Sequence, residues 1–264
     1  MAMSDALGRE HSPCTGAPRI VSLVPSLTEL VCDLDLAGQL VGRTGFCVHP
    51  KEALRSVSKV GGTKDVKLDV LRQLAPTHVI ADIDENRREV VEEIMEFVPN
   101  VIVVHPRTVD DNRGLYVLLG HVFRREHVAA QLAAAFAAAR AELDTLAHSL
   151  PREAVLYPIW REPWMTVRRD TYIAAMLAAA GWDSLPVEAA SRYPGFDWNA
   201  PWLADVQRVL LPSEPYAFTE RDAVEVGELV RVPVTRIDGE MVSWYGSRAI
   251  AGLRYLAELR RQLA

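Results

Sequence analysis

The sequence predicts an α/β protein of two lobes joined by one long α-helix. Its 264 residues are enough for two lobes with cores of their own. In both halves, short β-branched runs alternate with amphipathic segments, which is typical of right-handed βαβ units and parallel sheets. Between the halves, residues 125–150 contain neither glycine nor proline, which favours one uninterrupted helix.

The first lobe is expected over residues 18–124. A β-branched run at 19–24 is followed by Ser26 and Glu29, whose S-x-x-E spacing predicts a capping box at a helix start. The alternation then continues to the end of the lobe. The expected strands are 19–24, 40–44, 78–83 and 101–105, and the expected later helices are 67–75 and 85–97.

The interlobe helix is expected over residues 125–150. Its apolar side chains recur at steps of three and four residues, which is the pattern of one helical face. The stripe consists of Val128, Leu132, Phe136, Ala139, Leu143, Leu146 and Leu150.

The second lobe is expected over residues 151–264, where the alternation resumes. The expected strands are 154–159, 208–212 and 234–237, the helices are 170–181, 219–230 and 247–262, and 183–200 is expected to be a loop. In "LYPIWREPWM" (156–165), Pro158 and Pro163 argue against helix although Trp160 and Trp164 are four apart.

Composition restricts the class of protein. Apolar residues make up 49%, charged residues 24%, and the net charge is −6, so nucleic acid is not an expected partner. The three cysteines form no CxxC pair and cannot all pair within one chain, which argues against a disulfide framework.

Residues 1–17 are expected to form a flexible N-terminal tail. Charged residues such as Asp5 and Arg9 occupy the place where a signal peptide needs an apolar run, and no stretch approaches the ~20 apolar residues of a membrane span. We therefore expect a cytoplasmic protein without a membrane span. A periplasmic location is the alternative if a native leader was removed.

All six tryptophans follow residue 159. In open α/β sheets, ligands bind at the carboxyl ends of the strands. Four tryptophans fall where we expect loops after strands, and they predict an aromatic wall for a large, flat ligand. These four are Trp160, Trp164, Trp198 and Trp244.

Three further stretches each have two interpretations. "TGFCVHP" places Cys47 and His49 two residues apart, which suits zinc or copper ligation or, alternatively, a plain loop. "VGGTKD" (60–65) is either an anion-binding loop with Lys64 or a simple turn. Asp82, Asp84 and Glu85 are either acid/base groups or a solvated helix start.

The loop 239–248 mixes polar and aromatic side chains between two glycines. It is either a ligand wall or the closure of the lobe over the last helix. Its candidate residues are Met241, Ser243, Trp244, Tyr245 and Arg248.

Several motifs together resemble a known family. "PRIVSLVPSLTELV", "LVGRTGFCVHP", "LAPTHVIAD" and the alanine-rich helix are similar to the helical-backbone metal receptors, the class III periplasmic-binding-protein-like group. "IWREPWMTVRRDTYIAAMLAAAG", "LLPSEPYAF" and "DGEMVSWYGSR" resemble a branch associated with cobalamin or iron complexes. The resemblance spans residues 18–262 and implies two Rossmann-like α/β lobes with a ligand cleft between them.

The resemblance also implies site residues. Phe46 matches an aromatic position that follows the second strand, whereas Thr63 or Lys64 stands where cobalamin-binding relatives have tryptophan. Met241 stands at another tryptophan position, with Trp244 three residues later. Asp69 resembles the first-lobe carboxylate through which such proteins dock to a permease.

We therefore expect a non-enzymatic substrate-binding protein for a metal chelate of corrinoid, haem or ferric siderophore type, linked to ABC-type uptake. No covalent cofactor and no membrane span are expected, and the protein is expected to be a monomer that partners an ABC permease. Lys64, Arg161 or Arg248 would meet an anionic group of the ligand. The expected ligand-binding residues are Phe46, His49, Lys64, Asp82, Trp160, Arg161, Trp164, Trp198, Met241, Trp244 and Tyr245.

Two alternatives use the same scaffold. One is a cytosolic metal-handling protein or enzyme that uses Cys47, His49 and the nearby carboxylates. The other is a cytosolic sensor that binds a partner through an exposed aromatic patch.

Overall fold

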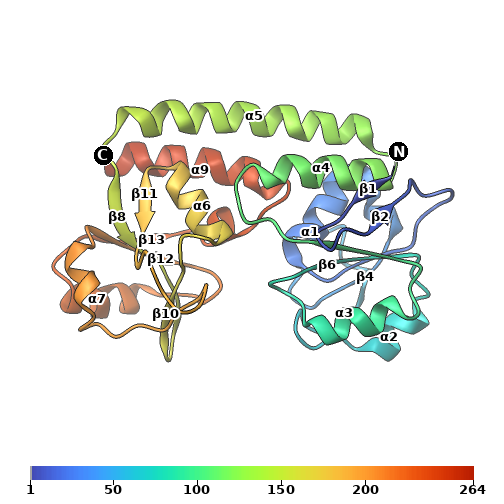
Figure 1. The fold of residues 1–264 in the computed structure, drawn as a ribbon, viewed down its shortest axis with the longest axis horizontal. Helices are drawn as coiled ribbons and strands as arrows, with labels where there is room; N and C mark the ends of the chain where they lie inside the picture. Colours follow the sequence, from blue (N-terminus) through green and yellow to red (C-terminus); the bar gives the residue numbers. More distant parts are fainter. Residues whose placement is uncertain (1) are drawn as a thin grey trace. The chain divides into compact units, whose positions relative to one another are not determined.

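A computed structural model describes residues 2–264, so Met1, the first residue of the expected tail, lies outside the described residues. The chain forms two compact units (Figure 1). The N unit comprises residues 2–106, 110–136 and 245–248, and the C unit comprises residues 107–109, 137–244 and 249–264.

The N unit is built on a five-stranded parallel sheet with the order β5-β4-β3-β6-β7. Its strands are β3 (Ile20–Ser22), β4 (Leu40–Arg43), β5 (Ser58–Lys59), β6 (His78–Asp82) and β7 (Asn100–Val104). Its helices are α1 (Pro25–Val31), α2 (Leu68–Gln73), α3 (Arg88–Met95) and α4 (Asp111–Val122), with the short turns η1 (Cys32–Leu36) and η2 (Ala37–Gln39).

Helices cover both faces of this sheet, α1 and α4 on one side and α2 and α3 on the other (Figure 1). The inner strands β3, β4, β6 and β7 are buried over most of their length and are largely apolar instead of alternating, whereas the edge strand β5 is exposed. Val21 and Val79 of the sheet pack with Leu71 of α2 and Ile94 of α3, and all four are inaccessible to solvent. The parallel α/β architecture predicted for this half is confirmed.

The start of α1 differs from the prediction. Val24 is the N-cap, Pro25 occupies the first turn, and no side chain caps the helix, so the capping box of Ser26 and Glu29 is wrong. Proline needs no hydrogen bond at that position, which makes a side-chain cap dispensable. Glu29 instead accepts both of its hydrogen bonds from Arg248, each 2.8 Å long.

The N-terminal residues form a hairpin of β1 (Met3–Ser4) and β2 (Glu10–His11), which corrects the expectation of a flexible tail for this segment. The buried Asp5 carboxylate accepts from the backbone N–H of Val103 at 3.1 Å and lies 3.0 Å from His11 Nε2. The Ala6 N–H donates to the Val103 carbonyl. Since β7 is an edge strand, these bonds cover part of an otherwise unpaired edge.

The long helix is α5 (Glu126–Ser149), a single element of 24 residues, as the apolar stripe predicts. Phe136, Ala139 and Leu143 of that stripe are buried, and no other member of the stripe is exposed. The helix begins in the N unit and continues in the C unit (Figure 1).

The C unit contains a four-stranded parallel sheet with the order β11-β8-β12-β13. Its strands are β8 (Glu153–Leu156), β11 (Trp182–Ser184), β12 (Arg208–Pro212) and β13 (Val234–Ile237). Its helical elements are α6 (Tyr172–Ala179), η3 (Pro201–Asp205), α7 (Glu220–Leu229), α8 (Glu240–Ser243) and most of α9 (Arg248–Leu263).

Two features of the C unit were not predicted in this form. The edge strand β11 begins at Trp182 and runs into the segment expected to be a loop. It was not predicted because three residues give too short a pattern to recognise. "LYPIWREPWM" forms a hairpin of β9 (Pro158–Arg161) and β10 (Trp164–Thr166). The prediction that this stretch is not helical is confirmed.

The described residues, 2–264, include no helix that is both long enough and apolar enough to span a membrane.

Candidate functional site

Exposed apolar side chains of the N unit gather in loops that follow its strands. Phe46 is 64% exposed and Val48 is 49% exposed, both after β4, and Ile83 after β6 is 41% exposed. The carboxyl ends of parallel strands share one edge of the sheet, where α/β proteins bind ligands. This edge is the candidate site of the N unit.

Cys47 does not belong to the exposed surface. Its thiol is inaccessible and lies 3.0 Å from Thr28 Oγ1 and 3.1 Å from Thr44 Oγ1. Burial raises its pKa, so the thiolate that would bind a metal is disfavoured. Across residues 2–264, no three or more His, Cys, Asp and Glu side chains gather as a metal site would require. The weak alternative of a metal held by Cys47 and His49 is therefore not favoured, and His49 is partly exposed in the candidate loop.

The "VGGTKD" segment is a tight turn. Gly61 has φ +105°, and a Cβ there would lie 2.3 Å from the Asp65 carbonyl oxygen, so only glycine fits. The Gly62 N–H donates to that same carbonyl, which removes it from the amides that an anion would need. Lys64 Nζ donates to the backbone oxygen of Asp84 at 2.6 Å. The alternative of a simple turn is favoured for this segment.

Asp82 ends β6 and is 3% exposed. Its Oδ1 accepts from the backbone N–H groups of Asp84 at 2.7 Å and Glu85 at 3.1 Å. Burial raises the pKa of Asp82 to about 7, while the hydrogen bond from the Asp84 amide and the nearby Tyr245 hydroxyl oppose that rise. Asp82 is therefore an internal group beneath the site, and it titrates near neutral pH.

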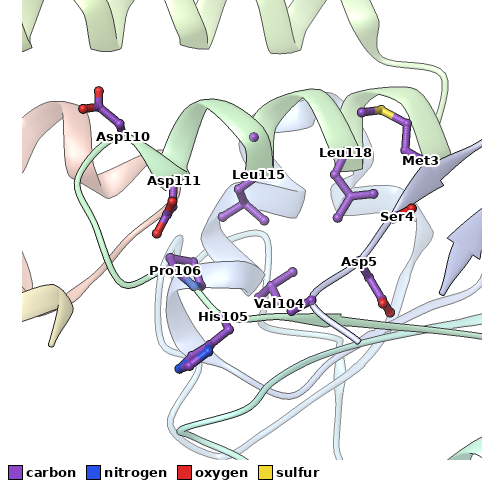
Figure 2. A pocket seen from close by; sticks show the side chains of 12 residues that line it. Met3, Ser4, Asp5, Val104, His105, Pro106, Asp110, Asp111, Leu115 and Leu118 are labelled. Atoms are coloured by element: carbon purple, nitrogen blue, oxygen red, sulfur yellow. The ribbon is translucent and has the colours of Figure 1, made fainter. Parts of the chain in front are cut away.

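A cavity of about 510 Å³ lies in the N unit between the hairpin residues Met3–Ala6, the end of β7 and the start of α4 (Figure 2). His105, Leu115 and Leu118 line it, and His105 Nε2 lies 3.4 Å from the Asp84 carboxylate. None of the ligand-binding residues expected from the sequence lines this cavity.

In the C unit, the tryptophans of the expected wall have different environments. Trp160 is 44% exposed and meets Tyr216 edge-on, with ring centroids 5.4 Å apart. Trp164 is half-buried, stacks on Phe218 at 5.8 Å and meets Trp198 edge-on at 5.0 Å. Among the four tryptophans of the expected wall, Trp160 is therefore the exposed ring, whereas Trp164 packs in an aromatic cluster with Trp198 and Phe218.

Two of the three predicted cations are already paired with carboxylates. Arg161 bonds to both Asp222 and Glu225, and Arg248 forms the bidentate pair with Glu29 described above. With these partners, neither guanidinium carries an uncompensated charge toward a ligand. Both predicted arginines therefore use their charge within the protein and not toward a ligand.

The segment 239–248 divides between the two units. Met241 is partly exposed, whereas Trp244 is 6% exposed and donates from Nε1 to Glu214 at 2.8 Å. Tyr245 is 7% exposed and lies beside Asp82 in the N unit. Packing inside each unit therefore accounts for both aromatic rings.

Several exposed or clustered apolar residues of the two units were not predicted from the sequence. Val48 and Ile83 extend the apolar edge of the N unit, and Phe196, Tyr216 and Phe218 complete the aromatic cluster of the C unit. The only signal for the last two was the aromatic pair in "EPYAF" directly after a strand.

The chain thus consists of two α/β units that share one long helix, with aromatic side chains in segments that follow strands. Residues 20–200 match the periplasmic binding protein family, and this chain belongs to that family. The chain is 21% identical over 261 residues to a vitamin B12-binding protein of Pectobacterium atrosepticum, covering 94% of this chain and 92% of the relative.

Solved structures share the fold. The periplasmic vitamin B12-binding protein BtuF of Vibrio cholerae has a TM-score of 0.78 and 16% identity, with 93% of this chain and 98% of that chain covered. The periplasmic haem-binding protein RhuT of Roseiflexus sp. RS-1 has a TM-score of 0.78 and 21% identity, with 94% and 99% covered. The haem-binding protein HutB of Vibrio cholerae has a TM-score of 0.76 and 16% identity, with 92% and 99% covered.

Proposed function

We propose that this protein binds a metal chelate of corrinoid, haem or ferric siderophore type and delivers it to an ABC permease. The observation that carries the proposal is the family match, whose relatives bear names of vitamin B12-binding and haem-binding proteins. The exposed rings of Phe46 and Trp160 support it, because aromatic faces give a large contact area at a small cost in side-chain entropy.

The proposed binding residues fall into two groups by exposure. Phe46, His49, Lys64, Trp160 and Met241 are exposed or partly exposed and are the proposed contact residues. Asp82, Arg161, Trp164, Trp198, Trp244 and Tyr245 are proposed to support them, because each is buried or already bonded within its unit. The protein acts as a binder and not as an enzyme, in line with its family.

Tryptophan fluorescence tests the proposal on the purified protein. All six tryptophans lie in the C unit, so quenching reports a chelate that approaches that unit. Aquocobalamin, haemin and a ferric hydroxamate are titrated separately, with N-acetyltryptophanamide as the control for light absorption by the chelate. Saturable quenching by at least one chelate below about 10 µM supports the proposal, and purely linear quenching by all three refutes it.

Two further parts of the proposal concern the cell. Asp69 in the first turn of α2 is exposed and is the proposed contact to the permease. Asp69→Lys is expected to abolish chelate uptake while leaving chelate affinity unchanged. A periplasmic location and a monomeric state complete the proposal, and they are tested by fractionation of cells expressing the native gene and by light scattering.

A further inference from the structure

The loop after β4 presents an exposed aromatic ring on a segment with no helix or strand. Residues 44–57 connect β4 to β5 through turns alone. Phe46, at 64%, is the most exposed of the large apolar side chains over residues 2–264. A connection of this length is ordinarily mobile unless side chains hold it in place.

Arg43, the last residue of β4, holds this loop from below. It is 8% exposed, and Nη1 donates to the carbonyl oxygens of Thr44 at 3.2 Å and Cys47 at 2.9 Å. Nη2 donates to the carbonyl oxygen of Leu54 at 3.2 Å. One planar guanidinium thus bonds to both the beginning and the far part of the same loop.

The thiol of Cys47 adds a second attachment. Its contacts to the hydroxyls of Thr28 and Thr44 join the loop to α1 and to the residue that follows β4. Cys47 and Thr44 are both inaccessible to solvent, and Leu54 is 1% exposed. The attachments therefore lie on the inner side of the loop.

Inward and outward side chains alternate along the loop. Thr44 and Cys47 point inward, whereas Phe46 and Val48 are exposed. The Phe46 ring also lies against the "VGGTKD" turn, since a Cβ on Gly62 would be 3.4 Å from its Cε2 atom. The bonds of Arg43 to the Thr44 and Cys47 carbonyl oxygens hold the backbone on both sides of Phe46.

We propose that Arg43 is a positioning residue, whose buried guanidinium orders the loop 44–57 and so presents Phe46 to the ligand. The ordering of the loop is independent of any ligand, whereas the presentation of Phe46 rests on the proposed function. Ordering before binding improves affinity because the loop then loses less conformational entropy when the ligand arrives.

Hydrogen exchange of the ligand-free protein tests the ordering. Arg43→Met removes the three bonds and keeps a side chain of similar length. Arg55→Met is the matched control, because Arg55 belongs to the same loop but its side chain is 75% exposed and pairs only with Glu52 among the described residues. We expect amide exchange at 45–57 to become about tenfold faster in Arg43→Met, with β6 and β7 unchanged and with no effect of Arg55→Met.

A double-mutant cycle with Phe46→Ala tests the presentation. If Arg43 acts through the ring, Arg43→Met weakens chelate binding about tenfold in the wild type but by less than threefold in Phe46→Ala. Full additivity of the two losses would overturn this part. Unchanged loop exchange, or exchange accelerated equally in β3 and β6, would overturn the ordering.

Arg43→Lys replaces Arg43→Met if the latter does not fold. Lysine keeps the charge but cannot donate along two directions from a rigid plane, so a smaller rise in loop exchange is expected, and no rise counts against the proposal. If the wild type binds none of the chelates, the proposed function fails while the exchange experiment still decides whether Arg43 orders the loop.

Discussion

Replacing Asp82 by asparagine removes a buried charge while keeping the shape of the side chain. The Asp82 Oδ1 atom accepts from the amides of Asp84 and Glu85, and the Oδ1 atom of asparagine can accept the same two bonds. Asp82 is 3% exposed, and burial raises its pKa from 3.8 to about 7. Asp82→Asn is therefore expected to stabilise the protein at alkaline pH.

The sign follows from proton linkage. Because the folded pKa is above the unfolded pKa, the folded state binds the proton more tightly, and ionisation of Asp82 destabilises the fold increasingly as the pH rises from 3.8 to about 7. A shift of about three units at about 1.4 kcal/mol each sets an upper limit of about 4 kcal/mol above pH 8. Between pH 5 and pH 8, the free-energy advantage of Asp82→Asn over wild type should grow by about 3 kcal/mol at most.

Urea unfolding of both proteins at pH 5, 6, 7 and 8 measures this advantage. Taking the difference between the free energies of unfolding of the two proteins cancels the contributions of titrating groups that the substitution leaves unchanged. Asp65→Asn is a suitable control, because the Asp65 side chain is 82% exposed and pairs with an arginine, which stays charged across these pH values. A constant difference across the four pH values, or a loss of stability in Asp82→Asn at pH 8, would refute the reasoning.

Three other predictions concern separate parts of the molecule. Trp160→Ala should weaken chelate binding about tenfold with little loss of stability, because the ring is exposed. Trp164→Ala should lower the free energy of unfolding in urea by about 3 kcal/mol, because Trp164 stacks inside the aromatic cluster. Equal losses of stability in the two variants would contradict this. Arg248→Met should cost about 3 kcal/mol, because it leaves Glu29 without its bidentate partner, and a loss below about 0.5 kcal/mol would argue against that pair. In a thiol assay with a disulfide reagent at pH 8, Cys14 should react first, since burial raises the pKa of Cys32 to about 11 and Cys47 is fully buried; early reaction of Cys47 would show that its loop opens.

The architecture was predictable because its signals are long and periodic. The stripe from Val128 to Leu150 leaves no alternative to a helix, and α5 follows it closely. Apolar runs such as His78–Asp82 predict buried parallel strands. Short elements gave no such signal: β11 has three residues, and the hairpin β1–β2 depends on contacts of Asp5 with Val103, far along the chain.

The candidate site was predictable only in outline. Residue type and position after a strand selected Phe46 and Trp160 as ligand-binding residues, and both side chains are exposed, as contact with a ligand requires. The same reasoning cannot show which polar groups are already bonded. Arg161 has partners 61 and 64 residues away, and Arg248 has its partner 219 residues away, so their pairing follows from tertiary structure alone.

The roles of Arg43 and Cys47 were hidden for a related reason. An arginine at a strand end and a cysteine near a histidine suggest surface chemistry in a sequence. In the structure, Arg43 donates to buried backbone carbonyls and Cys47 contacts a buried hydroxyl, so both residues bond within the protein.

Absorbance titration tests the central claim, chelate binding, most directly. Aquocobalamin, haemin and a ferric hydroxamate are each held at fixed concentration while purified protein is added, and the visible spectrum of the chelate is followed. We expect a saturable spectral change for at least one chelate, with a Kd of about 1 µM or lower, and an affinity at least tenfold weaker in the Phe46→Ala, Trp160→Ala double variant. Unchanged spectra for all three chelates, or equal binding by the double variant, would overturn the proposed chelate binding.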